Sequence, residues 1–186
     1  MNERLQTSTK TIYAAGDVIG GAQFSHLAGW QGFQAACNAL LPASRSAARA
    51  ALPRVTFCDP EVAQVGRTEA EARTSNGTDV VVAAWPIERE DRAVCDDDRD
   101  GVLKFITKRD GTLLGATIVG HRAGEAIAEV ALALEQKLRI GDIAGTIHAY
   151  PTYSTGVQLV ASELTVQGAL RGISGRLIRV ISRLTR

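Results

Sequence analysis

The chain has 186 residues, of which 45% are hydrophobic and 22% are charged, a composition typical of a globular protein with a core of useful size. Its 21 basic and 20 acidic residues leave a formal net charge of +1, so no overall positive field draws it to nucleic acid. No apolar run reaches the ~18 residues that a membrane-spanning helix needs, and we expect a cytoplasmic protein.

The first part of the chain predicts a strand followed by a helix. Residues 10–16 are β-prone and end in a glycine that is followed by Asp17, which indicates a strand that delivers an acid to a turn. Residues 25–41 suit a helix, with Ser25 as a candidate N-cap and Pro42 as a stop. Residues 42–53 are rich in Ala, Ser and Arg, as in a linker between domains.

Beyond this linker the pattern is that of strands. Residues 54–58 and 79–86 read as strands, and residues 68–73 between them read as a short helix. Residues 101–109 and 112–120 flank Asp110-Gly111, which predicts two strands joined in an antiparallel hairpin.

Helices follow the hairpin. In residues 123–138, Ile127, Val130, Ala131 and Leu134 recur at helical spacing, and this apolar stripe should pack on the sheet. Pro151 indicates a turn or a helix start, with a further helix over about residues 154–167. Strands followed by helices predict an α+β fold with a mainly antiparallel sheet and flanking helices.

The cysteines indicate no metal site and no disulfide framework, because Cys37, Cys58 and Cys95 stand far apart and form no C-x-x-C pair. We expect them to be buried, inert thiols.

Several motifs together resemble a known family. They are TIYAAGDV at 11–18, HLAGW at 26–30, VTFCDPEVAQVG at 55–66, GATIVG at 115–120, AGE at 123–125 and YPT at 150–152. This is their order in the class I pyridine nucleotide-disulfide oxidoreductases, the family of dihydrolipoamide dehydrogenase and mercuric reductase. The resemblance implies a remnant of the FAD-binding domain at 1–45 and a dimerisation domain at 46–167, which leaves a basic tail at 168–186.

The resemblance also implies flavin-binding residues. In the family, the acid of the Ala-Gly-Asp motif accepts a hydrogen bond from a ribityl hydroxyl of FAD, and Asp17 matches it here. Gly16 would allow the backbone to approach closely. The N-terminus of the following helix, with His26, Leu27 and Ala28, would face the pyrimidine side of the flavin.

His148 and Tyr150 are the candidate catalytic residues, acting across the dimer on the partner's flavin site. From spacing alone, a lone histidine such as His148 is more often structural than catalytic. In the register of the family, Tyr150 replaces the histidine of the proton-transferring His-Glu dyad and Thr155 replaces its glutamate. A phenol has a reference pKa of ~10, against ~6.5 for imidazole, which argues against a lipoamide substrate.

The implied parent enzyme reduces a disulfide or related acceptor with NAD(P)H through FAD, as a homodimer. The chain has no G-x-G-x-x-G after a strand and no closely spaced cysteine pair, so we expect it to be inactive alone. The alternatives are a free-standing dimerisation or interaction module, one half of a split oxidoreductase whose partner chain supplies the FAD and NAD domains, and a small flavin-binding protein.

The tail combines regularly spaced arginines with apolar residues from Leu170 to Leu184 and contains no acid after residue 167. This pattern predicts a basic amphipathic helix. It either packs on the domain with its arginines in water, which we favour because of its glycines, or attaches to an anionic membrane surface.

Overall fold

A computed structural model describes residues 1–42, 46–47 and 51–171 of the chain. The polypeptide divides into two compact units, Met1–Arg49 and Ala50–Arg186. The predicted tail lies outside the described residues from residue 172 onward, so the choice between its two readings stays a prediction.

The first unit contains a 3-10 turn, η1 (Asp17–Ile19), and helix α1 (Ser25–Leu40). Two details differ from expectation. Instead of a strand over residues 10–16, the described residues show a single antiparallel bridge between Gln6 and Tyr13. A strand needs a neighbouring segment that pairs with it over several residues, and residues 10–16 pair at one position only. Ser25 is the first helical residue rather than the N-cap. Phe24 precedes it in extended conformation without a side-chain cap bond.

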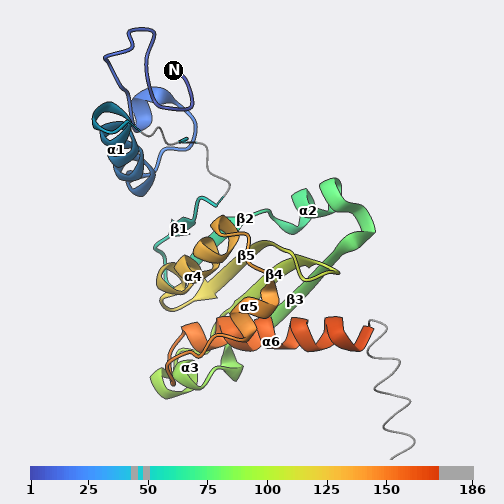
Figure 1. The fold of residues 1–186 in the computed structure, drawn as a ribbon. Coiled ribbons are helices and arrows are strands. Elements are labelled where there is room, and N and C mark those ends of the chain that lie inside the picture. The colour runs from blue at the N-terminus through green and yellow to red at the C-terminus, as the bar shows by residue number, and fades with distance from the viewer. Residues whose placement is uncertain (43–45, 48–50, 172–186) are drawn as a thin grey trace, which may run out of the picture. The chain divides into compact units, whose positions relative to one another are not determined.

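The second unit is built on a five-stranded sheet (Figure 1). Its strands are β1 (Arg54–Thr56), β2 (Glu61–Gly66), β3 (Val80–Pro86), β4 (Val102–Lys108) and β5 (Leu113–Gly120). The order across the sheet is β1-β2-β5-β4-β3, and every neighbouring pair is antiparallel. The predicted α+β fold with an antiparallel sheet is therefore confirmed.

The hairpin of β4 and β5 forms where the sequence predicted it. Gly111 takes φ +86° in the turn, a conformation that costs glycine little. The backbone N–H of Lys108 donates to the Thr112 carbonyl at 2.8 Å, and the N–H of Thr112 donates to Asp110 Oδ1 at 2.9 Å. The turn thus closes with both backbone and side-chain bonds.

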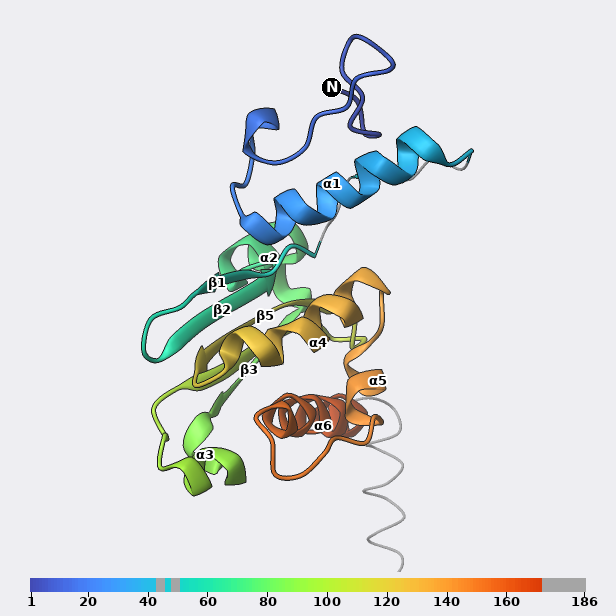
Figure 2. The ribbon, with the colours of Figure 1, turned by 90° about the vertical axis from the view of Figure 1, so that its left-hand side faces the viewer.

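Helices cover one face of the sheet (Figure 2). Helix α4 (Ala123–Glu135) packs on β2 and β5, α6 (Ser154–Arg171) packs on β3 and β4, and α5 (Ile140–Ala144) packs on α6. The core between them is fully buried at Val65, Phe105, Val130 and Val157. Burial of these side chains is the main source of the unit's stability.

The opposite face of the sheet carries a smaller cluster. Helix α2 (Glu69–Asn76) places Ala72 against Val80 and Ile106. Its N-terminus has a capping box, in which Thr68 and Glu71 bond each other's backbone N–H groups.

Several boundaries and environments differ from the sequence predictions. Helix α4 ends at Glu135, before residue 138, because Lys137 takes φ +57°. Strand β2, helix α3 (Asp91–Asp96) and helix α5 were not predicted. The expected burial of the cysteines was wrong, since Cys58 and Cys95 are exposed and Cys37 is only half-buried.

Candidate functional site

The loop between α5 and α6, residues 145–153, carries both candidate catalytic residues. It is a compact loop, because the Ala149 carbonyl accepts bonds from the hydroxyls of Thr152 at 2.7 Å and Thr155 at 3.2 Å. Gln158 of α6 donates to the Thr146 carbonyl at 2.9 Å. We call this segment the α5–α6 loop.

His148 anchors the α5–α6 loop to helix α4. Its Nε2 lies 2.8 and 2.9 Å from the two carboxylate oxygens of Glu129, and its Nδ1 lies 3.0 Å from the Thr146 carbonyl. All three partner atoms are hydrogen-bond acceptors, so the ring bridges helix α4 and the backbone of the loop. The side chain of His148 is only 6% exposed, and in this arrangement its ring holds the loop in place.

Tyr150 extends from the loop in the other direction and is 69% exposed. Its hydroxyl donates to Asp91 Oδ2 at 2.8 Å. This hydrogen bond, together with the negative charge of Asp91, raises the pKa of Tyr150 above its ordinary value. Near neutral pH the phenol is therefore a hydrogen-bond donor and not a base.

Three acidic side chains of one short segment hold the end of this loop and the start of α6. Besides the bond from Tyr150 to Asp91, Asp96 Oδ2 accepts the Tyr153 hydroxyl at 3.1 Å. Glu90 Oε1 accepts the backbone N–H of Gly156 at 3.2 Å. We call Glu90, Asp91 and Asp96 the acid clasp.

An arginine of the same segment holds one member of the acid clasp in place. Arg92 Nε donates to Asp96 Oδ2 at 2.8 Å, and this bond lowers the pKa of Asp96. Burial, followed by the bond to Asp96, raises the pKa of Tyr153 to about 12.

The acid clasp was not predicted from the sequence. Its only signal was the density of acids in residues 88–100, which reads equally well as a solvated charged surface.

A hollow of about 570 Å³ lies beside the loop. Glu129 and His148 form part of its wall, and Leu132, Leu138 and Ile147 line it as well. These three apolar side chains are exposed, Leu132 to 60% and Ile147 to 96%. Exposed apolar side chains gathered around a concave surface are typical of places where proteins bind partners.

The candidate flavin residues lie in the first unit. Gly16 takes φ +78°, and a Cβ added to it would lie 3.1 Å from Ala28 Cβ, so the segment before η1 packs closely on the first turn of α1. The Gly16 N–H donates to Gln31 Oε1 at 2.8 Å. Asp17 is exposed at the start of η1.

The other flavin candidates lie at the beginning of α1. His26 is exposed, and its ring stacks on Phe24 with 5.2 Å between centroids. Leu27 is half-buried. No motif pointed to Gln34, whose buried Oε1 accepts no hydrogen bond from any described residue.

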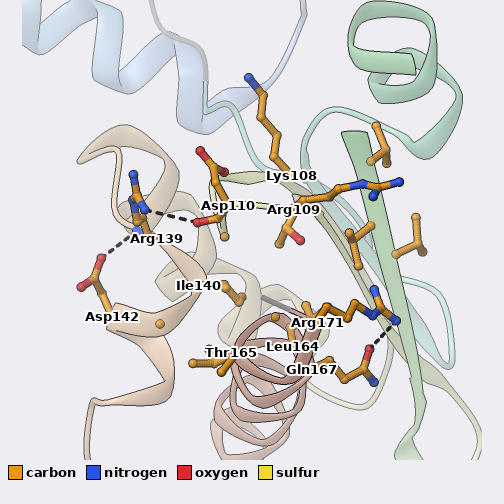
Figure 3. A pocket seen from close by; sticks show the side chains of 18 residues that line it. Lys108, Arg109, Asp110, Arg139, Ile140, Asp142, Leu164, Thr165, Gln167 and Arg171 are labelled. Atoms are coloured by element: carbon orange, nitrogen blue, oxygen red, sulfur yellow. Dashed lines mark hydrogen bonds between the residues drawn. The ribbon is translucent and has the colours of Figure 1, made fainter. Parts of the chain in front are cut away.

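A second hollow, of about 910 Å³, opens between β3, the β4–β5 turn, α5 and α6 (Figure 3). Its cationic lining consists of Lys108, Arg109, Arg139 and Arg171. Arg109 already donates to the Thr78 carbonyl, Arg139 to the Asp110 carbonyl and Arg171 to Gln167. These arginines therefore serve the fold rather than converging on one point.

The described residues contain no group of three or more metal-ligating side chains. Within the same part of the chain, no helix combines the length and the apolar character needed to cross a membrane.

Residues 52–161 match the family model of the pyridine nucleotide-disulphide oxidoreductase dimerisation domain. The chain is similar to the dihydrolipoyl dehydrogenase of Geobacillus stearothermophilus, with 39% identity over 167 residues, which is 89% of this chain and 35% of that protein. It is also similar to the mercuric reductase of Staphylococcus aureus, with 38% identity over 161 residues, or 86% of this chain and 29% of that one.

Among solved structures, the chain resembles the HOCl-induced flavoprotein disulfide reductase RclA from Escherichia coli. The TM-score is 0.80 at 30% identity, covering 87% of this chain and 38% of that one. LpdA from Mycobacterium tuberculosis gives a TM-score of 0.80 at 26% identity, with 88% and 36% covered. The chain thus spans about a third of the length of these relatives.

Proposed function

Because this chain belongs to the pyridine nucleotide-disulphide oxidoreductase family through its dimerisation domain, we propose that it supplies the subunit contact of an FAD-dependent NAD(P)H:disulfide-type oxidoreductase and forms a homodimer. The relatives are about three times as long as this chain. The oxidoreductase activity is therefore proposed for a complete enzyme, and the subunit contact is proposed for this chain.

The observation that carries the proposal is the apolar surface around the α5–α6 loop. Ile147 is almost fully exposed at 96%, and together with Leu132 and Leu138 it borders the hollow beside His148. A two-fold contact buries the same patch on both subunits. Removal of these side chains from water would then drive association.

The oligomeric state of the 186-residue chain tests this contact. Sedimentation equilibrium should give twice the mass of one chain for the wild type. Ile147→Asp should weaken the dimer at least tenfold, because it would bury a charge. Val18→Asp, which changes a residue of the first unit that is 82% exposed, is the matched control and should leave the mass unchanged. A wild-type monomer throughout a dilution series would contradict the proposal.

We also propose that the first unit contributes to the flavin site of the complete enzyme. FAD supplies the redox chemistry when it is bound. The exposed Asp17 carboxylate has no hydrogen bond to another described residue that would prevent it from accepting a flavin hydroxyl. The close packing of Gly16 on Ala28 would fix that carboxylate beside the N-terminus of α1, whose N–H groups favour negative charge.

Quenching of FAD fluorescence tests this assignment without any turnover. We expect weak quenching by the chain, and Asp17→Ala should weaken it about tenfold through loss of a charge-assisted hydrogen bond. The control is Asp97→Ala, an exposed acid of the second unit. Equal quenching by Asp17→Ala and the wild type would rule out the role of Asp17.

For the α5–α6 loop we propose a place beside the partner subunit's flavin site. Tyr150, exposed and protonated near neutrality, would donate a hydrogen bond there rather than accept a proton. His148, paired with Glu129, would keep the loop in position. This division of roles differs from that of a dyad in which a histidine transfers the proton.

A further inference from the structure

Glu90 differs from the other members of the acid clasp because it is buried. It lies between the 3-10 turn η3 (Ile87–Arg89) and α3, and only 1% of the residue is exposed. Its Oε1 accepts the backbone N–H of Gly156 at 3.2 Å. Gly156 belongs to the first turn of α6, whose N–H groups have no partner within the helix.

The second carboxyl oxygen of Glu90 lies against carbon atoms. Oε2 is buried and has no hydrogen-bond partner among the described residues. A Cβ added to Gly156 would lie 3.0 Å from Oε2 and 3.1 Å from Leu103 Cδ2, so the oxygen is enclosed by the backbone of α6 and a leucine of β4. A neutral carboxyl tolerates this position far better than a carboxylate, which would lack solvation.

Among the described residues, no cation compensates a negative charge at this point. The charged group that acts on Glu90 is Asp91, which repels a carboxylate, and the Gly156 N–H is the one group that favours it. Burial is the largest influence and raises the pKa of Glu90 to about 7. The carboxyl group of Glu90 therefore loses its proton close to neutral pH.

We propose that Glu90 is a positioning residue, whose neutral carboxyl closes the acid clasp and whose ionisation loosens the first turn of α6 together with the α5–α6 loop. The three bonds of the clasp end on Tyr150, Tyr153 and Gly156, so a change at Glu90 is transmitted to the segment that bears Tyr150. The consequence for the subunit contact rests on the proposed function, while the behaviour of the loop does not.

The size of the effect follows from linkage. We take the pKa of Glu90 to be near its ordinary value in the open loop and near 7 in the closed loop. Protonation of Glu90 then favours the closed loop. Between pH 6 and 8 the ratio of closed to open loop should then fall about tenfold. Little change is expected below the ordinary pKa, where both forms are protonated.

Amide hydrogen exchange of the full 186-residue chain measures this ratio directly. After correction for the intrinsic rate at each pH, protection of the amides of residues 153–156 should fall about tenfold between pH 6 and 8. In Glu90→Gln, whose amide keeps an oxygen for Gly156 and cannot ionise, protection should be independent of pH. Glu88→Gln, which changes an exposed neighbour, should behave as the wild type.

Sedimentation of the same samples separates this proposal from the proposed function. If the chain is monomeric but the pH dependence disappears only in Glu90→Gln, the positioning role stands and the dimer proposal fails. If Glu90→Gln retains the tenfold change, or the wild type shows none, the positioning role is wrong.

Discussion

The carboxyl group of Glu90 stays neutral in the folded chain at pH values where a free glutamate is ionised, because burial raises its pKa from 4.5 to about 7. A group whose pKa is raised by folding stabilises the native state below the unfolded pKa, and this contribution is lost as the pH rises through the folded pKa.

The free energy of unfolding should therefore fall by roughly 3 kcal/mol between about pH 4.5 and 7 on account of Glu90 alone. Urea titrations at a series of pH values, compared with the same titrations of Glu90→Gln, isolate this contribution. A constant difference between the two proteins over that range would show that the buried carboxyl does not titrate there.

The pair of His148 and Glu129 should contribute to the stability of the α5–α6 loop. The histidine side chain is 6% exposed, and its Nε2 lies 2.8 Å from Glu129 Oε1. A double-mutant cycle with His148→Gln and Glu129→Gln should give a coupling energy of about 1–2 kcal/mol. Additive effects of the two substitutions on the urea midpoint would indicate that the pair contributes nothing.

Among the elements, helix α6 depends on a glycine at its first turn. In Gly156→Ala, the added Cβ would lie 3.0 Å from Glu90 Oε2 and 3.1 Å from Leu103. We expect destabilisation of about 1–2 kcal/mol, despite the better helix propensity of alanine.

Gly168 of the same helix provides the control. Apart from the backbone of the helix itself, no atom of the described residues lies within 4 Å of a Cβ added there, so Gly168→Ala should stabilise the chain by up to ~1 kcal/mol. Thermal unfolding of the two variants should therefore shift in opposite directions, and a shift in the same direction would contradict the packing described for the acid clasp.

The elements that the sequence predicted best are those with a strong local signal. The β4–β5 hairpin follows from Asp110-Gly111 between two apolar runs, and α4 follows from the spacing of Ile127 and Val130. Helices α3 and α5 were missed because each is at most six residues long. Helices this short depend on tertiary contacts rather than on local propensity.

At the candidate site, sequence and resemblance indicated His148 and Tyr150 but not their partners. In the sequence, Glu129 is one of several acids in residues 123–138, and Asp91 is one of several in residues 88–100. The bonds from His148 to Glu129 and from Tyr150 to Asp91 span 19 and 59 residues of sequence. Such pairings are set by the topology of the sheet and have no local signature.

At the scale of the whole molecule, the second unit should fold without the first. Its main core cluster is formed entirely by residues between 51 and 164. A fragment of residues 51–171 should unfold cooperatively, with a midpoint within roughly 5 °C of that of the full chain. Broad, non-cooperative unfolding followed by circular dichroism would show that the core needs the first unit.

The positive charges around the hollow of Figure 3 also bear on the behaviour of concentrated solutions. Strand β3 is an outer strand of the sheet, and its residues Val80 to Val82 border this hollow beside Lys108 and Arg109. The outer edge of a strand is a template on which foreign chains can add and start to aggregate. Like charges beside that edge repel a second copy that approaches edge to edge, so these cations would act as gatekeepers of solubility.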